Sequence, residues 1–159
     1  MKLSEHMREI KFRVWIEEEK TMIDVPIIDF REKGKIKTTY SSPCGEWEYN
    51  FDEIELMQFT GLYDKNKVPI YEGDIVIFED CEMSTESGYG DTFINQGVVE
   101  YNDENCCFNV TERITVELVD VLYKGNESLE VIGNIYDNPD LLGEWIYGTR
   151  RIFWNWKAS

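Results

Sequence analysis

Carboxylates are the most abundant side chains in this sequence that could do chemistry, and they are also the least specific. The 159-residue chain carries 32 Asp+Glu against 16 Lys+Arg, which gives a formal net charge of −16. Two carboxylates can act as general acid and base, or as the pair of a glycosidase. No single pair stands out among so many, and Asp and Glu are usual surface residues. We therefore interpret most of them as a solvated acidic face.

Nucleophilic catalysis finds no support in the residue types. A Ser or Cys nucleophile needs a base to take its proton, most often an imidazole. The single histidine is His6, so a His-based triad and a multi-histidine metal site are excluded. The cysteines Cys44, Cys81, Cys106 and Cys107 lack CxxC spacing, and adjacent residues on a strand point to opposite faces. We interpret them as reduced thiols and predict that the protein is not an enzyme.

One segment resembles a calcium-binding loop, but only at its first positions. Asp64 and Asn66 occupy positions one and three of such a loop. Val68 then stands at position five, Pro69 replaces the required glycine, and Ile75 replaces the terminal glutamate. Neither GxxxxGK[ST] nor GxGxxG occurs, so no nucleotide-binding loop is indicated. We predict neither a cofactor nor a bound metal.

The C-terminal segment 145–156 is the strongest candidate for a binding surface. It combines aromatic side chains with two arginines, residue types that are enriched at binding hot spots. Its candidate interface residues are Trp145, Tyr147, Arg150, Arg151, Phe153, Trp154 and Trp156. Two interpretations stay open: a surface for self-association, and a final strand that closes the fold over its own core. A membrane-surface role is weaker, because anionic lipid would repel the acidic remainder.

Charge is distributed unevenly along the chain. Residues 1–40 hold 9 Lys+Arg and 8 Asp+Glu, residues 41–144 hold 4 and 24, and residues 145–159 hold 3 and none. Because the middle section repels a phosphate backbone, direct binding of DNA or RNA is disfavoured. The same charge supports an alternative function, an acidic decoy that binds a basic nucleic-acid-handling protein.

No segment indicates export or insertion into a membrane. Residues 1–15 are charged throughout and lack the apolar stretch of about 7–15 residues that a signal peptide needs. No apolar run approaches the roughly 18–20 residues that cross a bilayer. We expect a cytoplasmic protein without a membrane partner.

Strand patterns dominate the elements that would position these groups. Residues 9–16 alternate, with Ile10, Phe12, Val14 and Ile16 on one face, as in a half-buried strand. Residues 17–20 read as a turn, after which residues 22–28 are expected to return antiparallel. Further strands are predicted over residues 54–59, 75–78, 97–101, 107–110, 114–118 and 129–135, with turns at 60–61, 64–67 and 72–74.

Two stretches are polar or interrupted by Gly and Pro, and we predict them as long loops. They are residues 31–52, in which alternating lysines suggest one exposed strand, and residues 80–96. Residues 138–142 are expected to form a short helical turn. Asn138 would cap that turn, with Pro139 at the first helical position.

Three ordered motifs resemble the YopX family of phage and prophage proteins. The motifs are MREIKFRVW at residues 7–15, MQFTGLYDKN with IYEGDIV at residues 57–66 and 70–76, and VIGNIYDNPDLL at residues 131–142. The resemblance covers residues 7–142 as a single β domain, which leaves residues 1–6 as an upstream extension and residues 143–159 as an aromatic segment. One departure is Asn66-Lys67, where the family commonly has Asn-Gly and so a residue suited to positive φ.

The resemblance implies a mainly β fold: a small SH3-like β-barrel core over about residues 53–142, with additional N-terminal strands and a short C-terminal helical turn. It brings no catalytic residues. We interpret the signature glycines and Asp74 as turn chemistry, and exposed Tyr71 and Glu72 as further candidate interface residues. The predicted function is a phage-encoded, non-catalytic interaction module in the host cytoplasm, which binds a phage or host protein or a second copy of itself.

Overall fold

The mainly β fold is confirmed, with curled sheets that form a half-barrel. The computed structural model describes residues 9–24, 27–28, 35–42, 45–83, 90–111, 116–118 and 128–142. Its strands are β1 (Phe12–Ile16), β2 (Thr21–Asp24), β3 (Ile27–Ile28), β4 (Lys35–Ser42), β5 (Gly45–Asn50), β6 (Ile54–Tyr63), β7 (Pro69–Tyr71), β8 (Asp74–Met83), β9 (Gly90–Asn102), β10 (Cys107–Thr111), β11 (Val116–Glu117) and β12 (Glu130–Asn134). The 3₁₀ helix η2 (Pro139–Leu142) follows β12 and confirms the predicted helical turn.

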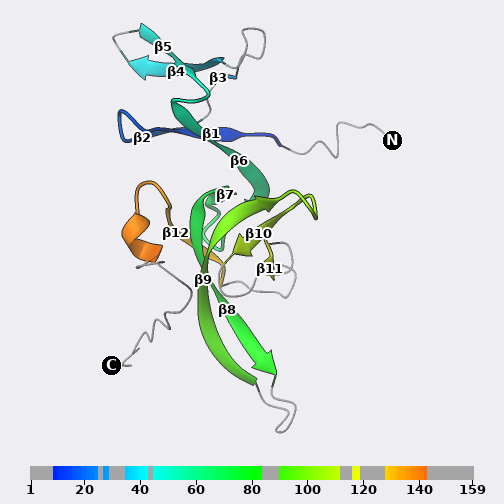
Figure 1. Ribbon diagram of the computed structural model, residues 1–159. Coiled ribbons are helices and arrows are strands. Elements are labelled where there is room, and N and C mark those ends of the chain that lie inside the picture. The colour runs from blue at the N-terminus through cyan, green and yellow to red at the C-terminus, as the bar shows by residue number, and fades with distance from the viewer. Residues whose placement is uncertain are drawn as a thin grey trace.

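These strands form three antiparallel sheets within the described residues. Their orders are β2-β1-β6-β7, β11-β10-β9-β8-β12 and β3-β4-β5. Figure 1 shows the small β3-β4-β5 sheet at one end of the molecule and the β8–β9 hairpin projecting at the other end. The sheet that holds β1 and β6 lies between them, so the N-terminal strands connect to the larger sheet through β6 and β7.

Strand β1 is buried on both faces, which differs from the half-buried strand that its alternation predicts. Val14 and Ile16 pack with Ile23 and Ile54 on one face. Trp15, on the other face, is 3% exposed and belongs to a second cluster. The reason is topological: β1 pairs with β2 on one side and β6 on the other, and another layer covers its second face.

The larger sheet encloses the main apolar cluster. Val76 and Phe78 of β8 and Val99 of β9 point to the same side of this sheet, as their register and the period of two require. They pack with Ile70, Phe108, Val110, Leu118 and Leu129. These residues confirm the strands predicted over 75–78, 97–101 and 107–110, and β6 and β12 confirm those over 54–59 and 129–135.

The two predicted long loops are wrong over most of the residues that the structure describes, although β4 confirms the strand that the alternating lysines suggest. Most of residues 35–50 form the β4–β5 hairpin, and residues 80–83 and 90–96 extend β8 and β9. Polar composition misleads here because strand pairing rests on backbone hydrogen bonds, which polar residues form as readily as apolar ones. The turn predicted at residues 60–61 is also wrong, since β6 continues through Gly61, which has a φ of 89°, with a shift in register against β7.

The predicted turns at residues 17–20, 64–67 and 72–74 are confirmed. Residues 21–24 return antiparallel to β1 as expected, but β3 pairs with β4 rather than with β1. Of the strand expected over residues 114–118, the structure describes β11 and Leu118. His6, Pro26 and Cys44 lie outside the described residues, as do Lys33 and the whole segment after Leu142.

Candidate functional site

A buried ion pair joins the N-terminal strand to the signature segment. Arg13 Nη2 on β1 lies 2.6 Å from Asp74 Oδ1 at the start of β8, and the two side chains are only 10% and 1% exposed. Arg13 Nη2 also donates to the Glu72 carbonyl oxygen at 3.1 Å. The guanidinium lies over the Tyr71 ring, 4.8 Å from its centroid. The cluster therefore holds β1 against the turn between β7 and β8.

Two opposing influences act on the Asp74 carboxyl group. Burial raises its pKa, while the charge of Arg13 and the hydrogen bond from the Tyr71 amide (2.8 Å to Oδ2) lower it. Oδ1 contacts Arg13 as an ion pair, without an aligned hydrogen bond from the described residues. A raised carboxyl pKa can indicate a general acid. This side chain is only 1% exposed, however, and it contacts Arg13 and the Tyr71 amide inside the fold.

The expected exposure of Tyr71 is wrong, and Glu72 is half-buried. Tyr71 is 6% exposed and packs against Phe59, with ring centroids 5.5 Å apart. Glu72 Oε2 accepts a hydrogen bond from the Gln58 amide at 2.8 Å, and its own amide donates to the Gln58 carbonyl at 3.0 Å. The turn at Gly73 directs both residues back onto β6 and β1. Both residues therefore connect β7 and its turn to β6.

The second signature carboxylate, Asp64, connects the turn after β6 to β12. Its Oδ1 accepts hydrogen bonds from the amides of Asn66 (2.7 Å) and Val68 (2.8 Å), and its Oδ2 accepts one from Val131 (3.2 Å). Lys65 strengthens the same connection through an ion pair of 2.6 Å with Glu130. Asp64 is 3% exposed, so this carboxylate too is committed to the fold.

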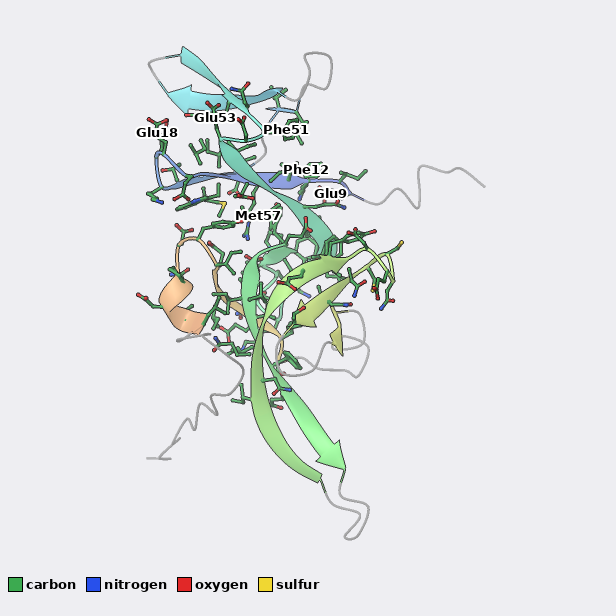
Figure 2. All side chains as sticks on the ribbon, in the orientation of Figure 1. Glu9, Phe12, Glu18, Phe51, Glu53 and Met57 are labelled. Carbon is green, nitrogen blue, oxygen red and sulfur yellow. The ribbon has the colours of Figure 1, made fainter. Side chains whose placement is uncertain are left out.

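The last motif folds η2 back onto β12. Asn134 Oδ1 accepts hydrogen bonds from the amides of Tyr136 (3.0 Å) and Asp137 (2.8 Å). Asn138 Oδ1 accepts a hydrogen bond from the Asn134 amide at 3.3 Å. Tyr136 then stacks on Trp15, 5.6 Å between ring centroids, so this motif also reaches β1. Met57, labelled in Figure 2, belongs to the same cluster.

This arrangement offers connections between strands more than groups ready for reaction. The carboxylates of Asp64, Glu72 and Asp74 all accept hydrogen bonds from backbone amides, and Asp74 also forms an ion pair with Arg13. Among the residues that the structure describes, no three His, Cys, Asp or Glu side chains gather closely enough to hold a metal ion. The Cys106 thiol in the β9–β10 turn donates to the Asp103 carbonyl oxygen at 3.6 Å, and the Cys107 thiol at the start of β10 donates to Asn109 Oδ1 at 3.3 Å.

The family model described as YopX protein matches residues 11–143. This chain belongs to the YopX family. The crystal structure of protein EF1440 from Enterococcus faecalis is similar, with 27% sequence identity and a TM-score of 0.55 over 86% of this chain and 99% of that chain. No curated protein matches the sequence. In the described part of the chain, no helix has the length and apolar character that a membrane span requires.

In the described part of this YopX protein, several large apolar side chains are exposed, both inside and outside the motifs. Ile10 and Ile94 are the most exposed, at 68% each. The other large apolar side chains that are exposed are Ile27, Phe51, Tyr63, Val68, Tyr101 and Leu141. The predicted interface residues from Trp145 to Trp156 lie outside the described residues.

Sequence reasoning missed Arg13 and Ile94. The alternation in β1 assigned Arg13 to solvent, and its partner Asp74 lies too far along the chain for any local pattern to reveal the pair. Ile94 stands in a segment that was predicted as a loop. The adjacent apolar residues Phe93 and Ile94 in an otherwise polar segment were the signal that this segment of the YopX chain is a strand.

Proposed function

We propose that this YopX protein is a phage- or prophage-encoded, non-catalytic protein-interaction module that works in the cytoplasm of the bacterial host. The observation that supports this most is the use of the signature residues. Asp64, Glu72 and Asp74 bind backbone amides inside the fold, so the motifs shape a scaffold. A scaffold of this kind presents its surface to a partner.

The contact surface in this proposal is the aromatic C-terminal segment. Trp, Tyr and Arg are enriched at hot spots because they bury large areas and also form directed polar contacts. The partner is a phage or host protein, or a second copy of the chain. The acidic middle section disfavours nucleic acid in this role.

The test replaces Trp154 and Trp156 with alanine in the full chain. Self-association is measured by sedimentation velocity, and partner binding by pull-down from host lysate. We expect both to be lost, and the matched control Tyr63→Ala, an aromatic residue that is 40% exposed on β6, to retain them. An unchanged monomer that binds nothing with or without the substitutions would contradict the proposal.

One observation favours a second candidate, the acidic decoy. Residues 79–96 carry five acidic residues and no Lys, Arg or His, and most of them lie in the projecting β8–β9 hairpin (Figure 1). Clustered carboxylates in an extended arm can attract a basic protein that normally binds phosphates. Such binding weakens steeply with salt, because the Debye length falls to about 8 Å at physiological ionic strength.

The decoy is tested by replacing the acids of the hairpin with amides: Glu79→Gln, Asp80→Asn, Glu82→Gln and Asp91→Asn. We expect the wild type to capture a basic nucleic-acid-handling protein at low salt and to release it at physiological salt, while the amide variant captures none. Salt-insensitive binding would contradict the decoy. A hydrolysis screen against phosphoesters and glycosides, with and without divalent metal, is expected to be negative for both candidates.

A further inference from the structure

The β8–β9 hairpin continues beyond the strands that flank it. Strand β12 pairs with β8 only as far as Ile77, and β10 pairs with β9 only from Val98 onward. The hairpin itself runs on to the pair Met83–Gly90. No described strand pairs with this outer half, although the Glu79 amide donates a hydrogen bond to Ser128 Oγ at 2.7 Å. A two-stranded ribbon is marginally stable alone in water, and natural proteins usually cover its edges.

The outer face of this hairpin carries an uncovered apolar side chain. Ile94 shares that face of β9 with Gln96 and Val98, because side chains alternate along a strand. The register places half-buried Ile77 of β8 opposite Gln96. The main cluster, with Val76 and Phe78, lies on the other face. Ile94 is 68% exposed, so the outer face has apolar surface that the described residues leave open to water.

The last described residues of the chain lie on this face. Gln96 Nε2 donates a hydrogen bond to the Leu141 carbonyl oxygen at 2.6 Å, which fixes η2 over β9. Leu141 itself is 37% exposed. Gln96 lies two residues before Val98, where the pairing of β9 with β10 begins. Leu141 is thus held by Gln96, which lies two residues from Ile94 on the same face of β9.

The segment that follows has the charge and reach to cover this face. Residues 145–159 contain three basic residues and no acid, whereas residues 79–96 contain five acids and no base. An extended chain spans about 3.3 Å per residue, so Trp154 can reach about 40 Å from Leu142. The hairpin from Gln96 to Gly90 measures only about 20 Å on the same scale.

We propose that the outer face of the β8–β9 hairpin, around Ile94, is the docking surface for residues 143–159 of the same chain. Aromatic side chains of this segment cover Ile94 and Leu141, and its arginines lie near the acids of the hairpin. This inference goes beyond the proposed function and does not depend on it. If the segment docks in this way, a partner that binds the aromatic segment must displace it from the hairpin. A partner that binds the hairpin must displace the segment.

The test uses the full chain and a matched pair of variants. Ile94→Lys removes the apolar contact and adds a like charge, while Ile10→Lys makes the same change at an equally exposed position outside the hairpin. The readout is the NMR indole resonances of Trp145, Trp154 and Trp156, compared with a synthetic peptide of residues 143–159. We expect the wild type and Ile10→Lys to differ from the peptide, and Ile94→Lys to approach it. Wild-type resonances that coincide with the peptide would overturn the proposal.

A second variant guards against a folding defect in the hairpin. The double substitution Arg150→Glu and Arg151→Glu changes only the segment, and we expect it to shift the amide resonances of Ile94 and Gln96 while those of β10 stay in place. Unshifted amides would count against docking. Indole shifts that vary over about a hundredfold range of protein concentration would assign the surface to a second copy and contradict the proposal. The Trp154→Ala and Trp156→Ala experiment measures self-association and partner binding, whereas the NMR experiment measures docking within the chain. A negative result in one therefore leaves the other proposal standing.

Discussion

Arg13 and Asp74 form an ion pair in the interior of this protein, with 2.6 Å between Nη2 and Oδ1 and side chains that are 10% and 1% exposed. One residue lies on β1 and the other opens β8, so the pair ties two sheets together. The carbonyl of Glu72 and the ring of Tyr71 complete the surroundings of the guanidinium. This contact thus joins the family motif at residues 7–15 to the motif at residues 70–76.

The substitution Arg13→Met is expected to destabilise the fold strongly. Removing one member of a buried pair leaves the other charge uncompensated, at a cost of about 3–5 kcal/mol in the free energy of unfolding. Urea denaturation followed by circular dichroism measures this loss. The control Lys11→Met changes a neighbouring lysine that is 33% exposed and paired with Glu9, and should cost less than about 1 kcal/mol. Equal losses for the two variants would contradict a special role for the pair.

The loss in Arg13→Met should also depend on pH. Arg13 lowers the pKa of Asp74, so its removal lets burial raise that pKa further. A folded-state pKa above the unfolded one means that the folded state binds more protons between the two values, so stability falls as pH rises through that window. We expect a smaller loss at about pH 5 than at pH 7. In the double variant Arg13→Met with Asp74→Asn, this dependence should disappear and part of the stability should return.

Local turn chemistry could be predicted from the sequence, whereas distant pairing could not. The turns at residues 64–67 and 72–74 follow from Asp and Gly at fixed positions, and the structure confirms them. The burial of Arg13 depends on a partner in another sheet. The extension of β8 and β9 through polar residues depends on pairing across a hairpin, and polar composition alone cannot distinguish this from a loop. Because residues 80–96 were predicted as a loop, the exposed position of Ile94 on a strand was not predicted either.

The substitution Lys67→Gly is expected to stabilise the protein. Lys67 has a φ of 67° in the turn where the family commonly has glycine, and a left-handed conformation is unfavourable for a residue with a Cβ atom. The free energy gained by relieving this strain exceeds the free-energy cost of the extra conformational entropy that glycine gives the unfolded chain. We therefore expect the free energy of unfolding to rise by about 0.5–1 kcal/mol. Thermal unfolding measures it. Lys67→Ala removes the same charge and keeps the strain, so a gain of the same size in that variant would contradict the explanation.

Ionisation of Tyr49 is expected to weaken the fold at high pH. The Tyr49 hydroxyl on β5 donates to Glu19 Oε1 at 2.5 Å, and its ring packs against the cluster around Val14. Burial, followed by the carboxylate of Glu19, raises the pKa of Tyr49 from 10.0 to about 12. Between these values the folded state keeps a proton that the unfolded state has lost, so stability falls as pH rises.

The measurement is the phenolate absorbance of the wild type minus that of Tyr49→Phe, followed as pH rises. The difference should show one group that titrates near the raised value. Glu19→Gln should lower this midpoint only in part, because burial remains the larger cause. A midpoint of about 10 in the wild type would show that the hydroxyl is solvated and that the contact between the β1–β2 turn and β5 does not form in solution.

The substitution Gly133→Ala is expected to disturb η2. A Cβ atom at this position would lie 2.5 Å from Asn138 Oδ1 and 2.9 Å from Leu141 Cδ1. Asn138 cannot move freely, since the same oxygen accepts the Asn134 amide. Overpacking of this kind costs about 1–3 kcal/mol, which urea denaturation would measure. The substitution Asn138→Ala removes the closest contact. In that background, Gly133→Ala should therefore cost less free energy of unfolding than it does in the wild type, so part of the loss is recovered. If nothing is recovered, the cost does not arise from the contact with Asn138.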